Sequence, residues 1–152
     1  MVDQVTFSNT TYQELPFKFE AGTTNYIGAI GLAAALDYLR SLGVDAIAEY
    51  EHELIRHTLR KLEEVEGLMI YGNAGNRISV FSFLIGKIHP YDAGMILDKM
   101  GIAVRTGHHC TQPVMDHYGI SGTIRASLVF YNTKEEVDLL AESLGKTIKM
   151  LS

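Results

Sequence analysis

The segment with the clearest chemical potential, residues 103–113, reads Ala-Val-Arg-Thr-Gly-His-His-Cys-Thr-Gln-Pro. Cys110, the single cysteine of the chain, directly follows His108 and His109, and Arg105 lies shortly before them. A cysteine attacks as its thiolate, and because the free thiol has a pKa of about 8.5, nearby cationic or hydrogen-bond-donating groups are needed. Arg105, His108 and His109 could supply them. Cys110 could equally be an inert core thiol with the histidines on the loop surface, and the local sequence leaves both interpretations open.

The residues that flank Cys110 predict a loop. Gly107 permits an unusual backbone turn, and Pro113 stops a helix from running through the segment. A metal site built from His108, His109 and Cys110 is disfavoured, because neighbouring ligands rarely point at one ion and no second pair at zinc-finger spacing exists. We therefore expect an exposed thiol and no metal.

The composition is that of a folded domain. Of 152 residues, 47% are apolar and 20% are charged, which argues against a disordered or fibrous chain. The formal net charge of -5 and the scattered lysines and arginines give no basic face for nucleic acid. The start of the chain has no leader-like segment, and the longest apolar stretch is interrupted by Asp37 and Arg40. We expect a cytoplasmic protein that binds neither nucleic acid nor a membrane.

The hydrophobic pattern predicts two long helices after an extended start. Residues 1–25 lack a helical period and indicate an arm or strand, whereas residues 26–42 are apolar nearly all round and indicate a helix with contacts on several sides. A second, amphipathic helix is predicted from after Gly43 to about Glu66. Its apolar face is expected to contain Val44, Ile47, Leu54, Thr58, Leu62 and Val65.

The remaining sequence predicts a small sheet with helices packed on it. Strands are expected at residues 68–71, 77–85, 102–105 and 123–130. The first two are separated by the turn residues Gly72, Asn73, Gly75 and Asn76. Pro90 opens a short helix, and Thr133 with Glu136 forms a capping box for the last helix. The inner face of that last helix is expected to contain Val137, Leu140, Ala141, Leu144, Ile148 and Leu151. This order of elements indicates an α+β fold.

Three stretches resemble the class V aminotransferase-like cysteine desulfurases, which use pyridoxal phosphate, and in particular the branch that serves iron–sulfur cluster assembly by the Suf route. Residues 105–110 with Pro113 are similar to the active-cysteine segment of that branch. Residues 125–133, Arg-Ala-Ser-Leu-Val-Phe-Tyr-Asn-Thr, are similar to its arginine strand. Residues 19–25, Phe-Glu-Ala-Gly-Thr-Thr-Asn, are similar to the stretch where the family's large domain gives way to its connecting helices. The resemblance runs from about Pro16 onward, with the spacing between the motifs intact.

The resemblance implies a role for individual residues. Cys110 is similar to the nucleophile that attacks the sulfur of cofactor-bound cysteine, which leaves L-alanine and a persulfide on the enzyme. Arg125 is similar to the arginine that clamps the substrate α-carboxylate. Arg105 would lie at the entrance of the same substrate site. Thr23 is similar to the residue that crosses a dimer interface to hydrogen-bond the cofactor phosphate.

The resemblance also implies partners and a supporting role for the active loop. His108 and His109 would support the loop that carries Cys110. The substrate would be L-cysteine, the enzyme would be a homodimer, and a sulfur-acceptor protein would receive the sulfur. The sequence leaves the preference between cysteine and selenocysteine open.

The chain also departs from the family. The resemblance assigns residues 1–43 to the tail of the cofactor-binding large domain and residues 44–152 to the small domain that carries the active cysteine. The large domain of the family supplies a Schiff-base lysine in a Ser-x-His-Lys setting, and none of the seven lysines here has that setting. They are Lys18, Lys61, Lys87, Lys99, Lys134, Lys146 and Lys149. Thr24 stands where proline is frequent in the family, and Thr111 stands where alanine is frequent.

These departures limit what the chain is expected to do alone. Without the cofactor lysine we expect it to be inactive, and with its apolar helix at residues 26–42 uncovered we expect it to self-associate. The alternative is a stand-alone, non-enzymatic sulfur-carrier or interaction domain that uses Cys110 as an acceptor.

Overall fold

The chain folds into two compact units, Met1–Val44 and Asp45–Ser152. The computed structural model describes residues 1–72 and 74–152. Asn73, expected in the turn between two strands, lies outside the described residues.

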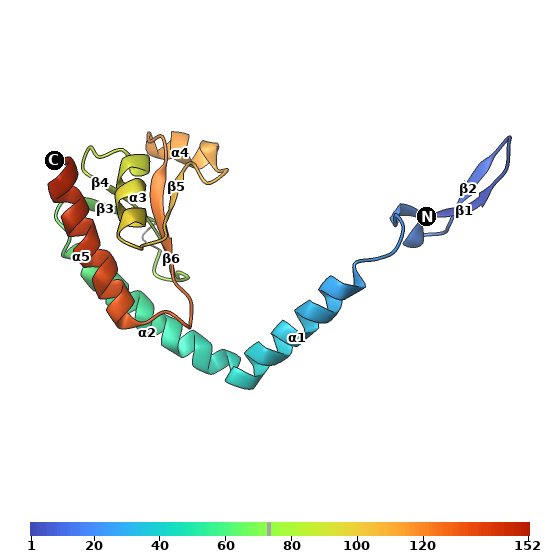
Figure 1. The fold of residues 1–152 in the computed structure, drawn as a ribbon, viewed down its shortest axis with the longest axis horizontal. Coiled ribbons are helices and arrows are strands. Elements are labelled where there is room, and N and C mark those ends of the chain that lie inside the picture. Colours follow the sequence, from blue (N-terminus) through green and yellow to red (C-terminus); the bar gives the residue numbers. More distant parts are fainter. Residues whose placement is uncertain (73) are drawn as a thin grey trace. The chain divides into compact units, whose positions relative to one another are not determined.

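The first unit contains a hairpin, a short 3-10 helix and one long helix (Figure 1). Its elements are β1 (Val2–Val5), β2 (Thr10–Tyr12), η1 (Phe17–Phe19) and α1 (Tyr26–Leu42). The strands β1 and β2 pair in antiparallel fashion, which confirms the extended start. The helix α1 has the predicted bounds and begins after Asn25, whose side chain accepts a hydrogen bond from the backbone N–H of Gly28 at 3.0 Å. No residue of α1 is buried, and all of its apolar side chains except the half-buried Leu39 are exposed.

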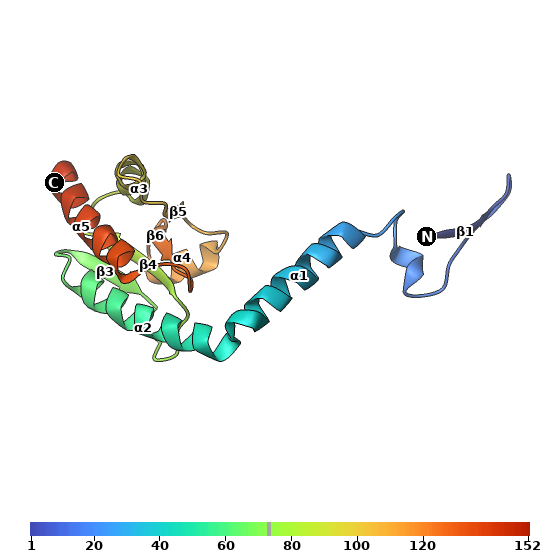
Figure 2. The same ribbon diagram turned by 60° about the horizontal axis from the view of Figure 1, so that its bottom comes forward.

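The second unit is built on a four-stranded antiparallel sheet (Figures 1 and 2). Its strands are β3 (Leu68–Tyr71), β4 (Val80–Ile85), β5 (Arg105–Gly107) and β6 (Thr123–Ser127), in the order β3-β4-β6-β5. Side chains alternate between the two faces of a strand, so Phe81 and Phe83 of β4 share one face with Ile124 and Ala126 of β6. All four are buried, and this face forms the core. The opposite face, here called the open face, contains Ser82 and Arg125.

Three helices cover the core face. They are α2 (Val44–Glu63), α3 (Pro90–Lys99) and α5 (Lys134–Leu151). Figures 1 and 2 both show α2 and α5 side by side, and α3 contacts α5, β5 and β6. A shorter helix, α4 (Gln112–Tyr118), lies on the other side of the sheet. The arrangement confirms the predicted α+β fold and the predicted capping box, in which Thr133 and Glu136 bond each other's backbone N–H groups.

The strand boundaries differ from those predicted because the neighbouring backbone forms turns. The predicted strand at residues 102–105 instead begins at Arg105, since the N–H of Ile102 donates to Leu97 O at 3.0 Å and prolongs the end of α3. The predicted strand at residues 123–130 ends at Ser127, because Val129 N–H is taken by the side chain of Asn132 at 2.9 Å. The strand predicted at residues 77–85 begins only at Val80.

Two predicted helix faces also need correction. In α2, Val44 is exposed, whereas Ile55, which the prediction omitted, is buried. In α5, Leu151 at the last turn is exposed. Ser143 and Thr147 are buried there instead, and the Thr147 hydroxyl donates to Ser143 O at 2.8 Å, which satisfies its polar atom inside the core.

Candidate active site

Cys110 lies on the loop between β5 and α4, and its side chain is exposed. The interpretation as a buried core thiol therefore does not apply. His109 and Cys110 both have left-handed backbone conformations, with φ values of 54° and 59°. Such conformations are unfavourable for residues other than glycine and persist where surrounding contacts hold them.

Hydrogen bonds to His108 hold the loop in this conformation. The backbone N–H of Cys110 donates to His108 Nδ1 at 3.0 Å. The hydroxyl of Thr111 donates to His108 O at 2.8 Å, and the Thr111 N–H reaches the same carbonyl at 2.9 Å. Because His108 Nδ1 accepts, this bond requires the ring of His108 to be unprotonated at that nitrogen. His108 thus acts on the backbone of the cysteine.

His109 turns its ring toward β6. Its Nε2 lies 3.0 Å from the hydroxyl oxygen of Thr123 and 3.3 Å from the Thr123 carbonyl oxygen. Burial lowers the pKa of His109 below its ordinary value of 6.5, and the positive charge of Arg125 lowers it further. These effects favour the neutral ring of His109 at neutral pH, so of the two kinds of group that the thiol could use, His109 is not the cationic one.

Arg125 and Arg105 face each other across neighbouring strands. The register pairs Arg105 of β5 directly with Arg125 of β6, and Ser82 of β4 pairs with Arg125 from the other side. Like charges placed opposite each other are unfavourable unless an anion lies between them or solvent screens them. Within residues 1–72 and 74–152, neither arginine has an acidic partner. The Nε of Arg125 is buried without a hydrogen-bond partner in this part of the chain.

A cavity of about 370 Å³, here called the site cavity, lies on the open face between the sheet and α4. Its polar lining comes from Tyr71, Ser82, His109, Thr111, Thr123 and Arg125. Its apolar lining comes from Val80, Val114, Met115, Tyr118 and Ile120. The residues on both sides of Cys110 thus line the same cavity as Arg125. An arginine, a neutral histidine and hydroxyl groups on an apolar wall suit a small ligand with one carboxylate.

Two of the predicted residues are not among those that line this cavity. Arg105 is exposed on the edge strand and does not line it. Thr23 belongs to the first unit, where it is exposed on the bend that precedes α1.

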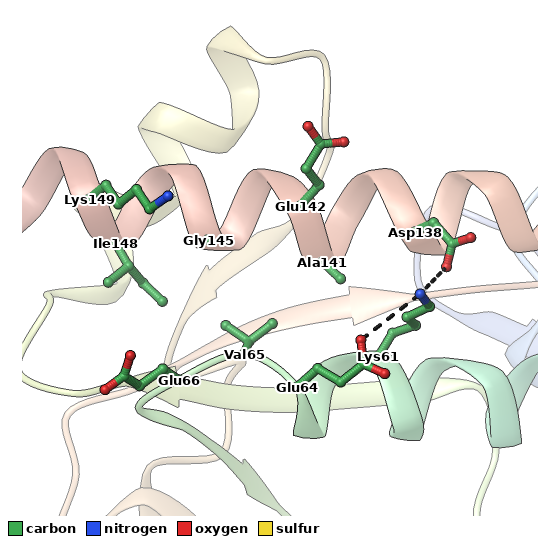
Figure 3. Close-up of a pocket in the computed structure, with 10 residues that line it drawn as sticks. All are labelled: Lys61, Glu64, Val65, Glu66, Asp138, Ala141, Glu142, Gly145, Ile148 and Lys149. Carbon is green, nitrogen blue, oxygen red and sulfur yellow. Dashed lines mark ion pairs between the residues drawn. The ribbon is translucent and has the colours of Figure 1, made fainter.

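A second cavity, of about 410 Å³, lies between α2 and α5 and has no cysteine, serine or threonine among its described lining residues (Figure 3). Figure 3 shows Lys61 between two carboxylates, with its Nζ 3.4 Å from Asp138 and 4.0 Å from Glu64. Asp138 also contacts His57 Nε2 at 2.8 Å, and this hydrogen bond lowers the pKa of Asp138. Lys61, Glu64, Asp138 and His57 pair with each other here, so this cluster joins the two helices and its charges are already partnered.

Residues 1–72 and 74–152 contain neither a metal-binding cluster nor a single membrane-spanning helix. No group of three or more His, Cys, Asp or Glu side chains in these residues is placed to hold a metal ion. No single helix there is long and apolar enough to cross a membrane. The bent pair α1 and α2, taken together, has the length and composition of a membrane span.

The chain matches one protein family over most of its length. The sequence model of the family described as Aminotransferase class-V matches residues 1–140. The chain therefore belongs to this family.

The relatives within that family are cysteine desulfurases. A probable cysteine desulfurase of Halalkalibacterium halodurans is 48% identical over 147 residues, which is 97% of this chain and 36% of that relative. A cysteine desulfurase of Serratia proteamaculans is 47% identical over 152 residues, which is 99% of this chain and 37% of that relative. These matches confirm the resemblance to cysteine desulfurases, and the chain spans little more than a third of the length of these relatives.

Solved structures show the same fold. The apo cysteine desulfurase of Thermococcus onnurineus superposes with a TM-score of 0.86 at 40% identity, covering 99% of this chain and 38% of that one. The cysteine desulfurase CsdA of Escherichia coli, in an S-sulfonic acid form, gives a TM-score of 0.88 at 34% identity, covering 100% of this chain and 38% of that one. Both confirm the α+β fold expected for this part of such an enzyme.

Three polar residues of the site cavity were missed by the sequence analysis. Thr123 precedes Arg125 by two positions, so the period-two alternation of a strand could have placed both on one face. Ser82 and Tyr71 reach the cavity through the strand register, which no single-sequence pattern indicates.

Proposed function

We propose that this chain is the substrate-binding and sulfur-accepting part of a pyridoxal-phosphate-dependent cysteine desulfurase. The observation that carries the proposal is the arrangement of an exposed Cys110 beside a cavity lined by Arg125, an arginine without an acidic partner in the described residues. The names of the relatives support it, because they are cysteine desulfurases. The Suf branch, a homodimer, a sulfur-acceptor protein and a cytoplasmic location belong to the same proposal.

The sulfur transfer is assigned to Cys110. Its thiolate attacks the sulfur of bound L-cysteine, so that an S–S bond forms while the Cβ–S bond of the substrate breaks. The electron pair of the broken bond stays with the substrate carbon, which takes up a proton to give L-alanine. A protein thiol and cysteine thus become a protein persulfide and alanine, and the balance needs no external oxidant or reductant.

Arg125 is assigned to the substrate carboxylate. Its guanidinium matches a carboxylate with two parallel hydrogen bonds, and charge-assisted bonds of this kind are worth roughly 1.5–3 kcal/mol each. Arg105, directly opposite in the register, adds positive charge at the entrance. With the carboxylate fixed by Arg125, the substrate sulfur is oriented toward the loop of Cys110.

The residues present fit the substrate side of a cofactor enzyme. The site cavity has an arginine for the carboxylate and no lysine among its described lining residues, so the group that binds the cofactor covalently is assigned to the part of the relatives that this chain does not span. The exposed hydroxyl of Thr23 is assigned to the cofactor phosphate. Pyridoxal phosphate, when bound in the complete enzyme, supplies the electron sink that makes the Cβ–S bond breakable.

The test is to locate the sulfur in a complete enzyme that contains this chain. After incubation with L-cysteine and without reductant, peptide mass spectrometry is expected to find one added sulfur atom on the peptide that contains Cys110, together with released alanine. If alanine is released while the added sulfur lies on another residue, Cys110 is not the acceptor. If sulfur is taken up from an external persulfide and no alanine is ever formed, the chain is a non-enzymatic sulfur carrier.

A further inference from the structure

Two buried side-chain atoms at the site lack the partners that their chemistry requires. Arg125 Nε carries a proton to donate, and His109 Nδ1 is the ring nitrogen not used by Thr123. Neither atom has a hydrogen-bond partner within residues 1–72 and 74–152. An unpaired buried polar atom is energetically unfavourable, so two of them beside one cavity call for a structural explanation.

The contact with Thr123 indicates which ring nitrogen of His109 carries the proton. We assign the proton to Nε2, because the Thr123 carbonyl oxygen at 3.3 Å can only accept a hydrogen bond and the Thr123 hydroxyl at 3.0 Å can accept one as well. The Nδ1 atom then has a free lone pair and is an acceptor. Thr123 is only 1% exposed, so this anchor is shielded from competing water.

The charged surroundings keep the ring neutral. The charged or titratable groups that act on His109 are Arg125 from β6, Arg105 from β5 and the neighbouring His108. All three disfavour an added proton, and no carboxylate is among them. Burial acts in the same direction, so the pKa of His109 lies below 6.5 and its acceptor nitrogen is available at neutral pH.

We propose that His109 positions Arg125 for the substrate carboxylate by accepting the Nε–H of Arg125 at Nδ1. Arg125 Nε is a hydrogen-bond donor and His109 Nδ1 is an acceptor, and both residues line the site cavity. The bond is not formed in the structure; in the proposal it forms when a bound carboxylate reorients the guanidinium. With Nε held in this way, the two terminal nitrogens of Arg125 would point together at the carboxylate. Thr123, His109 and Arg125 would then form a chain of hydrogen bonds that starts and ends on β6.

This inference rests on the proposed function and deepens it. His109 is a positioning residue, because it acts on substrate through Arg125. Protonation of His109 would remove the acceptor and add a positive charge beside Arg125, so the KM for cysteine should rise as the pH falls through the pKa of His109. That pKa lies on the acid side of 6.5.

The direct test is a double-mutant cycle on the KM for cysteine in the complete enzyme. His109→Leu is expected to raise KM about tenfold, as for the loss of one hydrogen bond to a charged group. Arg125→Lys has no Nε–H, so adding His109→Leu to it should change KM by less than about twofold. His109→Asn has a side-chain oxygen that can replace Nδ1, and asparagine tolerates the left-handed backbone, so it should recover most of the lost affinity. Thermal unfolding of each variant checks that it is folded.

The outcomes separate this inference from the proposed function. If Arg125→Lys raises KM and the effect of His109→Leu simply multiplies with it, the two residues act independently and the positioning role is wrong. If Arg125→Lys leaves KM unchanged, the substrate role of Arg125 fails, and this inference fails with it.

A second measurement needs no substitution and no cofactor. Nitrogen-15 NMR of the 152-residue chain is expected to show His109 as the neutral Nε2–H form at pH 7. A ring protonated at Nδ1 in that spectrum would remove the acceptor and overturn the inference.

Discussion

At the scale of the residue, the central feature is an arginine in an otherwise apolar strand. Arg125 lies between Ile124 and Ala126, which are both buried in the core, and its own side chain points to the open face. A charge at such a position must be paired or face a cleft, because unpaired burial is unfavourable by several kcal/mol. No Asp or Glu in the described residues pairs with it, and it lines the site cavity. Its partner is therefore to be sought in a ligand.

The substitution Arg125→Lys tests that assignment. Lysine keeps the charge and loses the planar fork, so we expect the KM for cysteine to rise by about one to two orders of magnitude in the complete enzyme. Steady-state kinetics measures it. Arg77→Lys is the matched control, because Arg77 also has a buried Nε without a partner in the described residues but stacks on Phe81 at 4.9 Å, outside the site cavity. An unchanged KM in Arg125→Lys, or an equal rise in both variants, would contradict the carboxylate role.

At the scale of the element, the contact between β5 and β6 holds the cysteine loop beside the arginine. Gly107 ends β5 and Gly122 directly precedes β6. A Cβ atom at Gly122 would lie 2.6 Å from the carbonyl carbon of Gly107 and 2.8 Å from its oxygen. The two backbones can approach this closely only because Gly122 has no side chain. The geometry of the loop that carries Cys110 thus depends on this close approach of the Gly107 and Gly122 backbones.

Gly122→Ala should disrupt the close approach of the Gly107 and Gly122 backbones. Overpacking against backbone is expected to lower the free energy of unfolding by about 1–3 kcal/mol, measured by chemical denaturation. Gly145→Ala is the matched control, because a Cβ there meets nothing within 4 Å inside the helix α5, and it should stabilise the protein by about 0.5–1 kcal/mol. Equal stabilities of the two variants would mean that the Gly107 and Gly122 backbones are not as tightly packed as the structure indicates.

The sequence predicted the elements better than the contacts between them. The helix α1 and the capping box of α5 follow from local patterns, and both were predicted correctly. The predicted start of β5 was wrong because the backbone N–H of Ile102 donates to Leu97 O, in a local turn at Gly101 that ends α3.

The candidate site was predictable only as residue types. Cys110 and Arg125 stood out because one is a lone cysteine among polar neighbours and the other is a charge in an apolar strand. The pairing of His109 with Thr123 depends on strand register and on a left-handed backbone, neither of which a local pattern encodes. The sequence therefore left open whether His109 is a cation or a neutral hydrogen-bonding group, and its lowered pKa favours the neutral ring.

At the scale of the whole molecule, the chain spans about 36 to 37% of the length of its relatives. The site cavity is lined on one side by the sheet and on the other by α4, and its described lining has no lysine. The proposed chemistry therefore needs residues from the remaining length of such an enzyme.

The isolated 152-residue chain should accordingly be inactive. We expect that it neither binds pyridoxal phosphate covalently nor releases sulfide from cysteine, because none of its lysines is placed at the site cavity. Absorbance spectroscopy with borohydride reduction is the measurement. A cofactor band that borohydride abolishes and fixes to the chain would contradict this expectation.

The most direct test of the central claim is the variant Cys110→Ala in the complete enzyme. The cysteine acts on the substrate sulfur and not on the cofactor, so we predict that persulfide formation and sulfide release stop while the cofactor absorbance stays close to that of the unmodified enzyme. The measurement is sulfide release from L-cysteine, read beside the cofactor spectrum of the same sample. Undiminished sulfide release by Cys110→Ala, with the cofactor bound, would contradict the assignment of Cys110 as the sulfur acceptor.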